Sequence, residues 1–276
     1  MTKKMNRNLI LIVLVSLFTQ LTNAQSPWTR EKGKAYVQIG STSLTYDTFQ
    51  FDGKKRENVG DYSDFTIQAY TEYGITNKLE AQLILPYKYA SFKNLGFSES
   101  ISGFSNISVG LKYKLSDKDW KISTGILFSA NSITKDENLT VSTTGINAST
   151  FLPYLTIGSS HNKWHYFGNI GYGYMDNNYS DYLKVAFEVG YKVIPKGHLM
   201  LVLDSRNPVT KESAFTNDNL QWASHLDRQA YNAFGIKASY EFIKDKFGAN
   251  FSTFGAFGID NSPLAPTLNL GVYAKL

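Results

Sequence analysis

The sequence predicts an all-β protein, a single antiparallel barrel of about 12 strands, on three observations. Segments of roughly ten residues with alternating character recur along the chain, each followed by a break. Every second break is a tight turn, and aromatic residues gather beside those turns. Short turns at one end and longer loops at the other are typical of transmembrane β-barrels of the bacterial outer membrane.

The first 24 residues predict a cleaved signal peptide. Lys3, Lys4 and Arg7 precede the apolar run LILIVLVSLF, and Ala24 ends a small-residue cleavage site before Gln25. That run is about half the roughly 20 apolar residues that a transmembrane helix needs. The sequence therefore divides into a signal peptide over 1–24 and one barrel domain over 25–276.

Charge and cysteine content exclude several classes of protein. The leader holds three of the 28 basic residues and none of the 23 acidic ones, so the mature chain carries 25 minus 23, or +2. No basic surface for nucleic acid is expected from so small an excess. The chain has no cysteine, which excludes disulfides and thiolate metal sites.

Alternation of apolar and polar residues predicts the strands in chain order. They are expected at 33–46, 62–75, 79–91, 104–115, 120–130, 150–158, 164–174, 182–193, 198–206, 230–242, 247–257 and 266–275.

The breaks between these strands fall into a short and a long class. Turn-forming Asp, Asn, Gly, Lys and Pro fill the short class, at 76–78, 116–119, 159–163, 194–197 and 243–246. The long class comprises 47–61, 92–103, 131–149 and 207–229, whereas 175–181 and 258–265 are of intermediate length. A soluble sandwich has no reason to place its short turns on one side, so the layout favours a membrane barrel.

Residue parity shows which face of each strand is apolar. In 182–193, Leu183, Val185 and Phe187 oppose Lys184 and Glu188. On the apolar faces, aromatics lie beside the tight turns: Tyr73, Tyr113, Trp120, Trp164, Tyr166, Tyr191, Tyr240 and Phe247. A ring of amphipathic aromatics at one rim suits a membrane interface, so the apolar side is expected to face lipid.

The opposite parity predicts the residues that line the lumen. They are Gln68, Tyr70, Glu72, Glu80, Gln82, Lys112, Lys114, Lys184, Glu188, Lys192, Lys237 and Glu241, together with Asp204 and Arg206. Opposite charges could pair across the interior and plug it, or leave a pore open. Twelve strands lie between the packed interior of eight and the aqueous channel of sixteen, and the sequence leaves both open.

Catalytic and metal sites find little support. His161, His165 and His198 flank tight turns and are interpreted as solvated turn residues. Only His225, next to Ser224, lies in a long loop, and adjacent residues rarely aim their side chains at one another. We expect no enzyme, no cofactor and no metal site.

The last strand ends LNLGVYAKL. Asn269, Gly271, Ala274 and Leu276 fit the pattern that outer-membrane barrels present to their assembly machinery, although the usual final aromatic is replaced by Leu276. The expected partners are outer-membrane lipid, that machinery and a small-molecule solute, with no nucleic acid.

A family resemblance rests on the leader and on three segments: PWTREKGKAYVQIG, EYGITNKLEAQLILPY and ISVGLKYKL. With these the chain resembles the outer-membrane barrels grouped under the meta-pathway of phenol degradation, most strongly over 27–128. The resemblance implies an outer-membrane transporter, loosely similar to channels for hydrocarbons and fatty acids.

The expected function is a passive channel or uptake protein for small molecules, apolar or aromatic by family resemblance, in the outer membrane of a Gram-negative cell. A structural or surface-interaction barrel that acts through the loops 47–61, 131–149 and 207–229 is the alternative. An outer-membrane acyl hydrolase is a third reading with less support.

Overall fold

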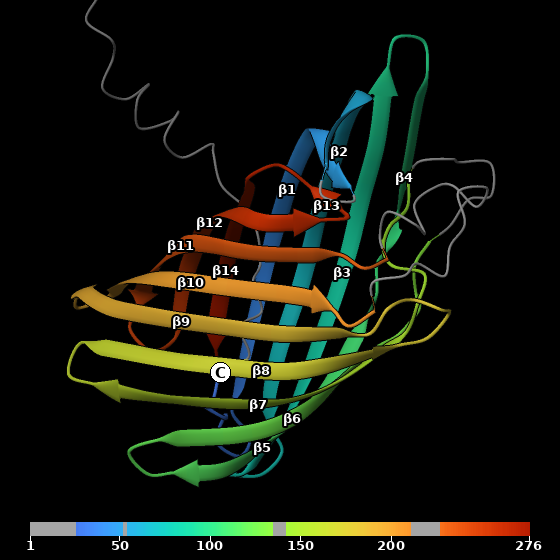
Figure 1. Cartoon of the computed structure of the whole chain (residues 1–276). Coiled ribbons are helices and arrows are strands. Elements are labelled where there is room, and N and C mark those ends of the chain that lie inside the picture. The colour runs from blue at the N-terminus through green and yellow to red at the C-terminus, as the bar shows by residue number, and fades with distance from the viewer. Residues whose placement is uncertain (1–25, 52–53, 135–141, 211–226) are drawn as a thin grey trace, which may run out of the picture.

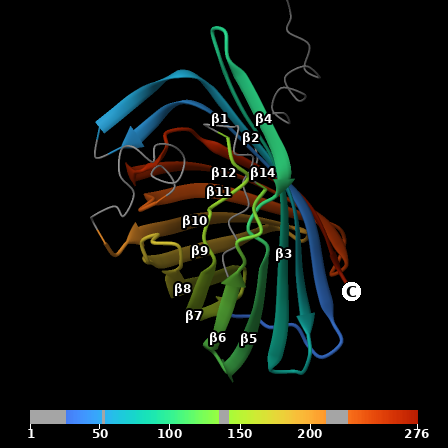
Figure 2. The same ribbon diagram turned by 90° about the vertical axis from the view of Figure 1, so that its right-hand side faces the viewer.

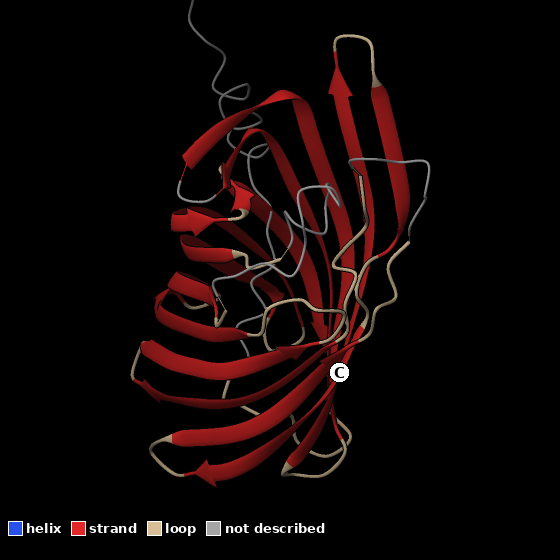
Figure 3. Ribbon diagram, turned by 45° about the vertical axis from the view of Figure 1, so that its right-hand side comes forward, coloured by secondary structure: helices blue, strands red, loops and turns tan. Residues whose placement is uncertain are grey.

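The computed structural model describes residues 26–51, 54–134, 142–210 and 227–276. These residues form one closed antiparallel barrel, and none of them is helical (Figures 1 and 3). A search of the described residues for a helix long and apolar enough to cross a membrane finds none. The predicted signal peptide and its cleavage site before Gln25 lie outside the described residues, so they remain predictions.

Fourteen strands occur in the described residues, and all but β4 and β13 complete a wall of twelve. They are β1 (Ala35–Phe51), β2 (Lys54–Gly74), β3 (Leu79–Asn94), β4 (Ser98–Phe104), β5 (Ser108–Asp117), β6 (Lys121–Ser129), β7 (Thr150–His161), β8 (Trp164–Met175), β9 (Tyr182–Ile194), β10 (Gly197–Pro208), β11 (Ala230–Ile243), β12 (Phe247–Asp260), β13 (Ser262–Pro263) and β14 (Thr267–Lys275). β5 pairs with the first half of β3 and β4 with the second half, so the two together occupy one place in the wall.

The barrel closes because β1 pairs with both β2 and β14. Where β1 meets β14, two reciprocal backbone hydrogen bonds join Ala35 and Leu276, 3.0 and 2.8 Å long. Gly33 N–H donates to the carbonyl of Gly74 at 2.8 Å, which brings the start of the wall to the first tight turn. This end of the barrel, which carries all five tight turns, is termed the tight-turn end, and the opposite end is termed the loop end.

The predicted twelve-stranded antiparallel barrel is confirmed, but two predicted long loops are wrong. β1 runs to Phe51 and β2 begins at Lys54, where 47–61 was expected to be a loop. β3 and β4 likewise pair across most of 92–103, from Tyr87↔Phe104 to Lys93↔Ser98. Figure 2 shows β1 to β4 rising beyond the other strands. Because this extension lies beyond the apolar band, its sequence has no need to alternate, and the period-two signal disappears.

Side chains on the outer face are apolar and those inside are polar, as the parity predicts. Ile39 and Leu201 expose 56% and 62% of their surface, whereas Glu80, Lys112 and Thr156 are fully buried. Near the tight-turn end, exposed Trp120 packs edge-on against Tyr166 with ring centroids 5.7 Å apart. An inverted distribution of this kind is stable only where lipid replaces water around the wall.

We predict that a charge on the outer face destabilises the barrel according to its depth. Leu201 lies inside β10, whereas Val193 is the penultimate residue of β9, and both are exposed. Leu201→Arg should lower the free energy of unfolding by about 2–4 kcal/mol and Val193→Arg by about 0–1 kcal/mol. Urea titration in lipid vesicles, followed by the mobility difference between folded and unfolded protein, measures both. Equal effects at the two positions would contradict the assignment of the lipid-facing belt.

Candidate functional site

The segment before β1 enters the barrel and binds its inner wall. Lys112 Nζ donates to the carbonyl oxygens of Ser26 and Trp28, at 3.2 and 2.9 Å. Ser123 Oγ donates to the carbonyl of Pro27 at 2.6 Å, and Pro27 is among the most completely buried residues. The segment therefore occupies part of the lumen near the tight-turn end, where no segment was predicted.

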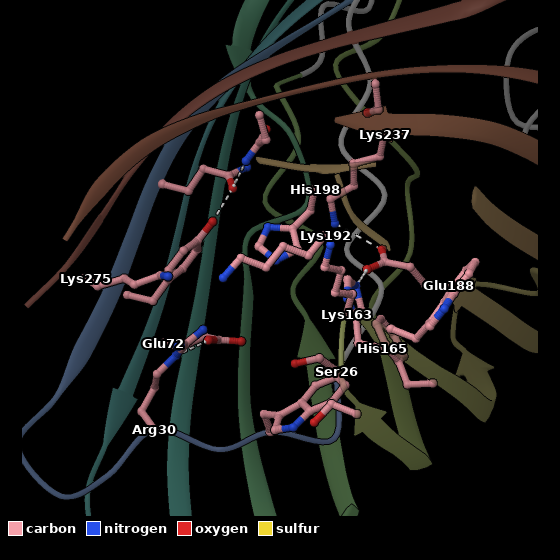
Figure 4. A pocket seen from close by; sticks show the side chains of 18 of the residues that line it. Ser26, Arg30, Glu72, Lys163, His165, Glu188, Lys192, His198, Lys237 and Lys275 are labelled. Atoms are coloured by element: carbon pink, nitrogen blue, oxygen red, sulfur yellow. Dashed lines mark hydrogen bonds and ion pairs between the residues drawn. The ribbon is translucent and has the colours of Figure 1, made fainter. Parts of the chain in front are cut away.

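Arg30 joins this segment to a buried charge cluster. Its Nε lies 2.7 Å from Glu72 Oε2 (Figure 4). Its backbone N–H donates to Glu80 Oε2, also at 2.7 Å. Glu80 also pairs with Lys112 at 2.8 Å, directly across the β3–β5 ladder. Burial opposes the charged guanidinium, but the carboxylates of Glu72 and Glu80 and the hydrogen bond to Glu72 together prevail, so the pKa of Arg30 is raised.

Hydrogen bonds extend the charge cluster into a polar layer across one side of the barrel. Tyr70 Oη donates to Glu72 at 2.7 Å, and Gln82 Nε2 donates to Glu80 at 3.2 Å. Tyr154 Oη reaches Gln82 Oε1 from β7, also at 3.2 Å. Gly125, opposite Tyr154 in the β6–β7 ladder, leaves the necessary space, since a Cβ there would lie 2.4 Å from Tyr154 Oη. Side chains of β2, β3, β5 and β7, with residues 26–30, thus fill this side of the lumen.

Among the cavities that the described residues line, three follow one another along the interior. The lower chamber, about 600 Å³, lies at the tight-turn end and is lined mainly by charged and aromatic residues (Figure 4). The middle chamber, about 430 Å³, is lined by Leu44, Ile84, Leu127, Leu152 and Phe254 among others. The upper chamber, about 340 Å³, lies towards the loop end and shares Leu44, Gln229 and Pro263 with the middle one.

The lower and middle chambers abut along the wall formed by β8, β9 and β12. On each of these strands, consecutive inward positions line first one chamber and then the other. The pairs, lower chamber first, are Phe167 and Asn169, Glu188 and Ala186, and Ser252 and Phe254. On the side of the lumen opposite the polar layer, the apolar and charged regions are therefore adjacent.

Twelve of the fourteen residues predicted from parity as lumen-lining fall into distinct surroundings. Tyr70, Glu72, Glu188, Lys192 and Lys237 line the lower chamber, whereas Glu80, Gln82 and Lys112 belong to the polar layer and Lys184 lines the middle chamber. Glu241 pairs with Lys275 at 2.5 Å, across the intervening strand β12. Gln68 lies on the same face of β2 as Tyr70, but it lines none of the three chambers. Lys114 pairs with Asp117 at the turn after β5, at 2.9 Å.

The middle chamber contains one ion pair in apolar surroundings. Lys184 on β9 binds Asp204 on β10, and its Nζ lies 5.5 Å from the centre of the Tyr231 ring. Arg206, the next inward residue on β10, stacks its guanidinium 3.8 Å from the centre of the Tyr182 ring. Lys184 is thereby neutralised, and Arg206 is covered by an aromatic ring and does not line the chamber, so the chamber's lining is dominated by apolar residues.

Two histidines interpreted as solvated turn residues instead face the lumen. His165 Nε2 lies 3.3 Å from Glu188, and the rings of His165 and His198 are 5.9 Å apart. Gly190 makes room, because a Cβ there would lie 2.0 Å from His165 Cε1. The parity of β8 and β10 contains this signal, since His165 alternates with outward Trp164 and Tyr166. His161 is exposed at its turn, as interpreted.

The other candidate sites add no chemistry to this lumen. No group of three or more His, Asp or Glu residues in the described ranges is arranged to hold a metal ion. Ser224 and His225 lie outside the described residues.

Residues 20–261 match the family described as "Putative MetA-pathway of phenol degradation". The chain belongs to that family. No curated protein matches the sequence significantly. The matched segment includes nearly the whole wall and every residue of the polar layer, so the family resemblance seen in the sequence is confirmed.

Solved structures show the same architecture. The COG4313 outer membrane channel from Pseudomonas putida F1 superposes with a TM-score of 0.72 at 13% identity, over 93% of this chain and all of that one. The KdgM porin gives 0.50 at 10% identity, over 86% and 98%. The translocator domain of the autotransporter NalP from Neisseria meningitidis gives 0.50 at 9%, over 89% and 88%. With the apolar outer face, this fold makes the family member an outer-membrane β-barrel.

We predict strong coupling between Lys112 and Glu80. Both side chains are fully buried, so Lys112→Met or Glu80→Gln alone should cost about 3–5 kcal/mol by leaving a buried charge without its partner. The double variant should cost clearly less than the sum of the two. Unfolding in urea from lipid vesicles gives the three values.

The Lys114–Asp117 pair provides the control for this cycle. Asp117 exposes 61% of its side chain, so the coupling there should stay below about 1 kcal/mol. Additive effects at Lys112 and Glu80 would mean that the polar layer is held by packing rather than by its ion pair.

Proposed function

We propose that the protein is a passive channel that carries small molecules with an apolar part across the outer membrane. The observation that carries this proposal is the middle chamber, a cavity lined mainly by apolar residues inside a barrel whose inward face holds many buried polar and charged groups. A cavity of a few hundred Å³ with apolar walls and few polar groups is the usual form of a small-molecule site.

The arrangement of the chambers supports passage rather than storage. The upper and middle chambers share three lining residues, and the middle and lower chambers meet along β8, β9 and β12. A solute that enters at the loop end meets apolar walls first and charged walls last. Conduction requires binding that is weak and spread over several sites, which a series of shallow chambers provides.

Residues 26–30 act in this proposal as a constriction. They bind the side of the lumen formed by β2, β3, β5 and β6, and the side near β8 to β12 retains the cavities. The segment thereby narrows a lumen that twelve strands would leave wider, and it sets an upper limit on solute size.

The described histidines support a channel rather than an acyl hydrolase. Outer-membrane acyl hydrolases place a serine and histidine on the lipid-facing surface near the external rim. His165 instead lies inside the barrel at the tight-turn end, held by Glu188. At this position His165 is one of the polar side chains that line the lumen.

Conductance in a planar bilayer tests the constriction. Trp28→Ala combined with Arg30→Ala removes the indole that packs against Phe167 and the guanidinium that binds Glu72. The variant should conduct several-fold more than the unmodified protein, because residues 26–30 lose their hold on the wall. Lys32→Ala is the matched control, since Lys32 binds Asn77 through its backbone N–H and its exposed side chain forms no ion pair among the described residues. If both the unmodified protein and the double variant fold but neither conducts, the protein is not a channel.

A second experiment tests the apolar route. Ala233 faces the middle chamber, and Ala238 lies on the outward face of the same strand, β11. Ala233→Phe should slow the uptake of benzyl alcohol by intact cells that lack their major porins, because the added ring fills the chamber. Ala238→Phe adds the same ring on the lipid side and should leave uptake unchanged. Equal uptake by both variants would place the solute route elsewhere.

A further inference from the structure

The lower chamber has an excess of positive charge. Its lining includes the five cations Arg30, Lys163, Lys192, Lys237 and Lys275 and the two anions Glu72 and Glu188. Five minus two leaves three positive charges, and Glu241, which pairs with Lys275, reduces this to two. The excess is concentrated in one cavity, whereas the mature chain as a whole carries only +2.

Internal ion pairs already neutralise three of these five cations. Arg30 pairs with Glu72 at 2.7 Å, Lys237 with Glu188 at 3.1 Å, and Lys275 with Glu241 at 2.5 Å. Among the described residues, Lys163 and Lys192 form no ion pair. They are neighbours in space, because the backbone N–H of Lys192 donates to the carbonyl of Lys163 at 2.8 Å.

Lys192 is the better placed of the two to meet a ligand. It is half-buried on the inward face of β9, directly opposite His198 in the β9–β10 ladder. Figure 4 shows Lys192, His198, Lys163 and Lys237 around the same space, with Glu188 turned towards Lys237. Lys163 is exposed at the turn before β8, and its Nζ lies 6.0 Å from the centre of the Tyr191 ring. An anion in the chamber therefore meets a Lys192 that is in no ion pair among the described residues, while Glu188 in the same lining is paired with Lys237.

The two sides of this cavity suit an amphipathic ligand. Trp28 lines the chamber and packs edge-on against Phe167, with ring centroids 5.8 Å apart. Along β9, Ala186 lines the middle chamber and Lys192 the lower one, six residues apart, or about 20 Å of extended strand. A solute of one aromatic ring therefore leaves the apolar walls of the middle chamber before its polar group reaches Lys192.

We propose that the lower chamber is a transient binding site for small amphipathic carboxylates, with Lys192 receiving the carboxylate. The inference rests on the proposed channel and specifies the charge of what passes through it. The apolar part of the ligand packs against Trp28 and Phe167, which line the same chamber, and the anionic group is drawn to Lys192. A cation with the same apolar part meets repulsion at the same place.

Reversal potentials in a planar bilayer test this with two probes of one shape and opposite charge. Gradients of potassium benzoate and of benzylammonium chloride give the permeability of each organic ion relative to that of its small counter-ion. The full-length protein should favour benzoate over benzylammonium. The preference should shrink as potassium chloride is added, because salt screens a partly solvated charge.

Lys192→Met should lower the benzoate preference by about two- to fivefold, the range expected for one partly solvated ion pair. Lys192→Glu should reverse it. Lys114→Met is the matched control, because Lys114 lies near the same end of the barrel but pairs with Asp117 at a turn. Lys163→Met provides a second, milder test that does not depend on the folding of the Lys192 variants.

The outcomes separate this inference from the channel itself. Potassium chloride current with no preference between the two probes would overturn the carboxylate site and leave the channel standing. A benzoate preference that is undiminished in Lys192→Met would also overturn it, by assigning the selectivity to other groups. Absence of any current would refute the proposed function before the question of charge arises.

Discussion

Lipid around the wall is the constraint from which the rest of this structure follows. A strand in lipid must satisfy its backbone through its neighbours, so the wall has to close, and β1 closes it by pairing with both β2 and β14. Each strand then places alternate side chains in lipid and in the interior. The outer face holds apolar residues, and the interior holds charged and polar groups that need hydrogen-bond or ion-pair partners.

The interior meets this need mainly with ion pairs formed between strands. Lys112, fully buried, contacts Glu80, Glu72 and two backbone carbonyls of the N-terminal segment. Lys237 and Lys275 each reach a carboxylate across an intervening strand, which the curvature of a closed barrel allows. A buried pair adds little net stability but makes the loss of either partner expensive. The pairs therefore fix where Arg30 and its segment lie more than they add to the total stability.

Much of the wall could be predicted from the sequence, because its signal is local. The period of two and the tight turns identify twelve strands, and parity separates Lys184 and Glu188 from Leu183 and Phe187. The same parity places His165 and His198 inside, although both lie beside tight turns, where solvated histidines are common. Residues 26–30 carry no periodic signal, because they bind through backbone carbonyls and one guanidinium. Their place in the lumen depends on contacts with residues 42 to 96 positions away, which a single sequence does not reveal.

Burial decides which interior charges hold the structure and which remain available. Lys112 has no exposed surface, and removing it from water is tolerable only because two carboxylates and two carbonyls surround its ammonium group. Lys192 keeps part of its surface in a cavity of about 600 Å³, so its charge is solvated and stable without a carboxylate. A charge that folding does not require to be paired remains free to attract a passing anion. The polar layer and the lower chamber thus use the same residue type for opposite purposes, and the depth of each lysine determines which purpose it serves.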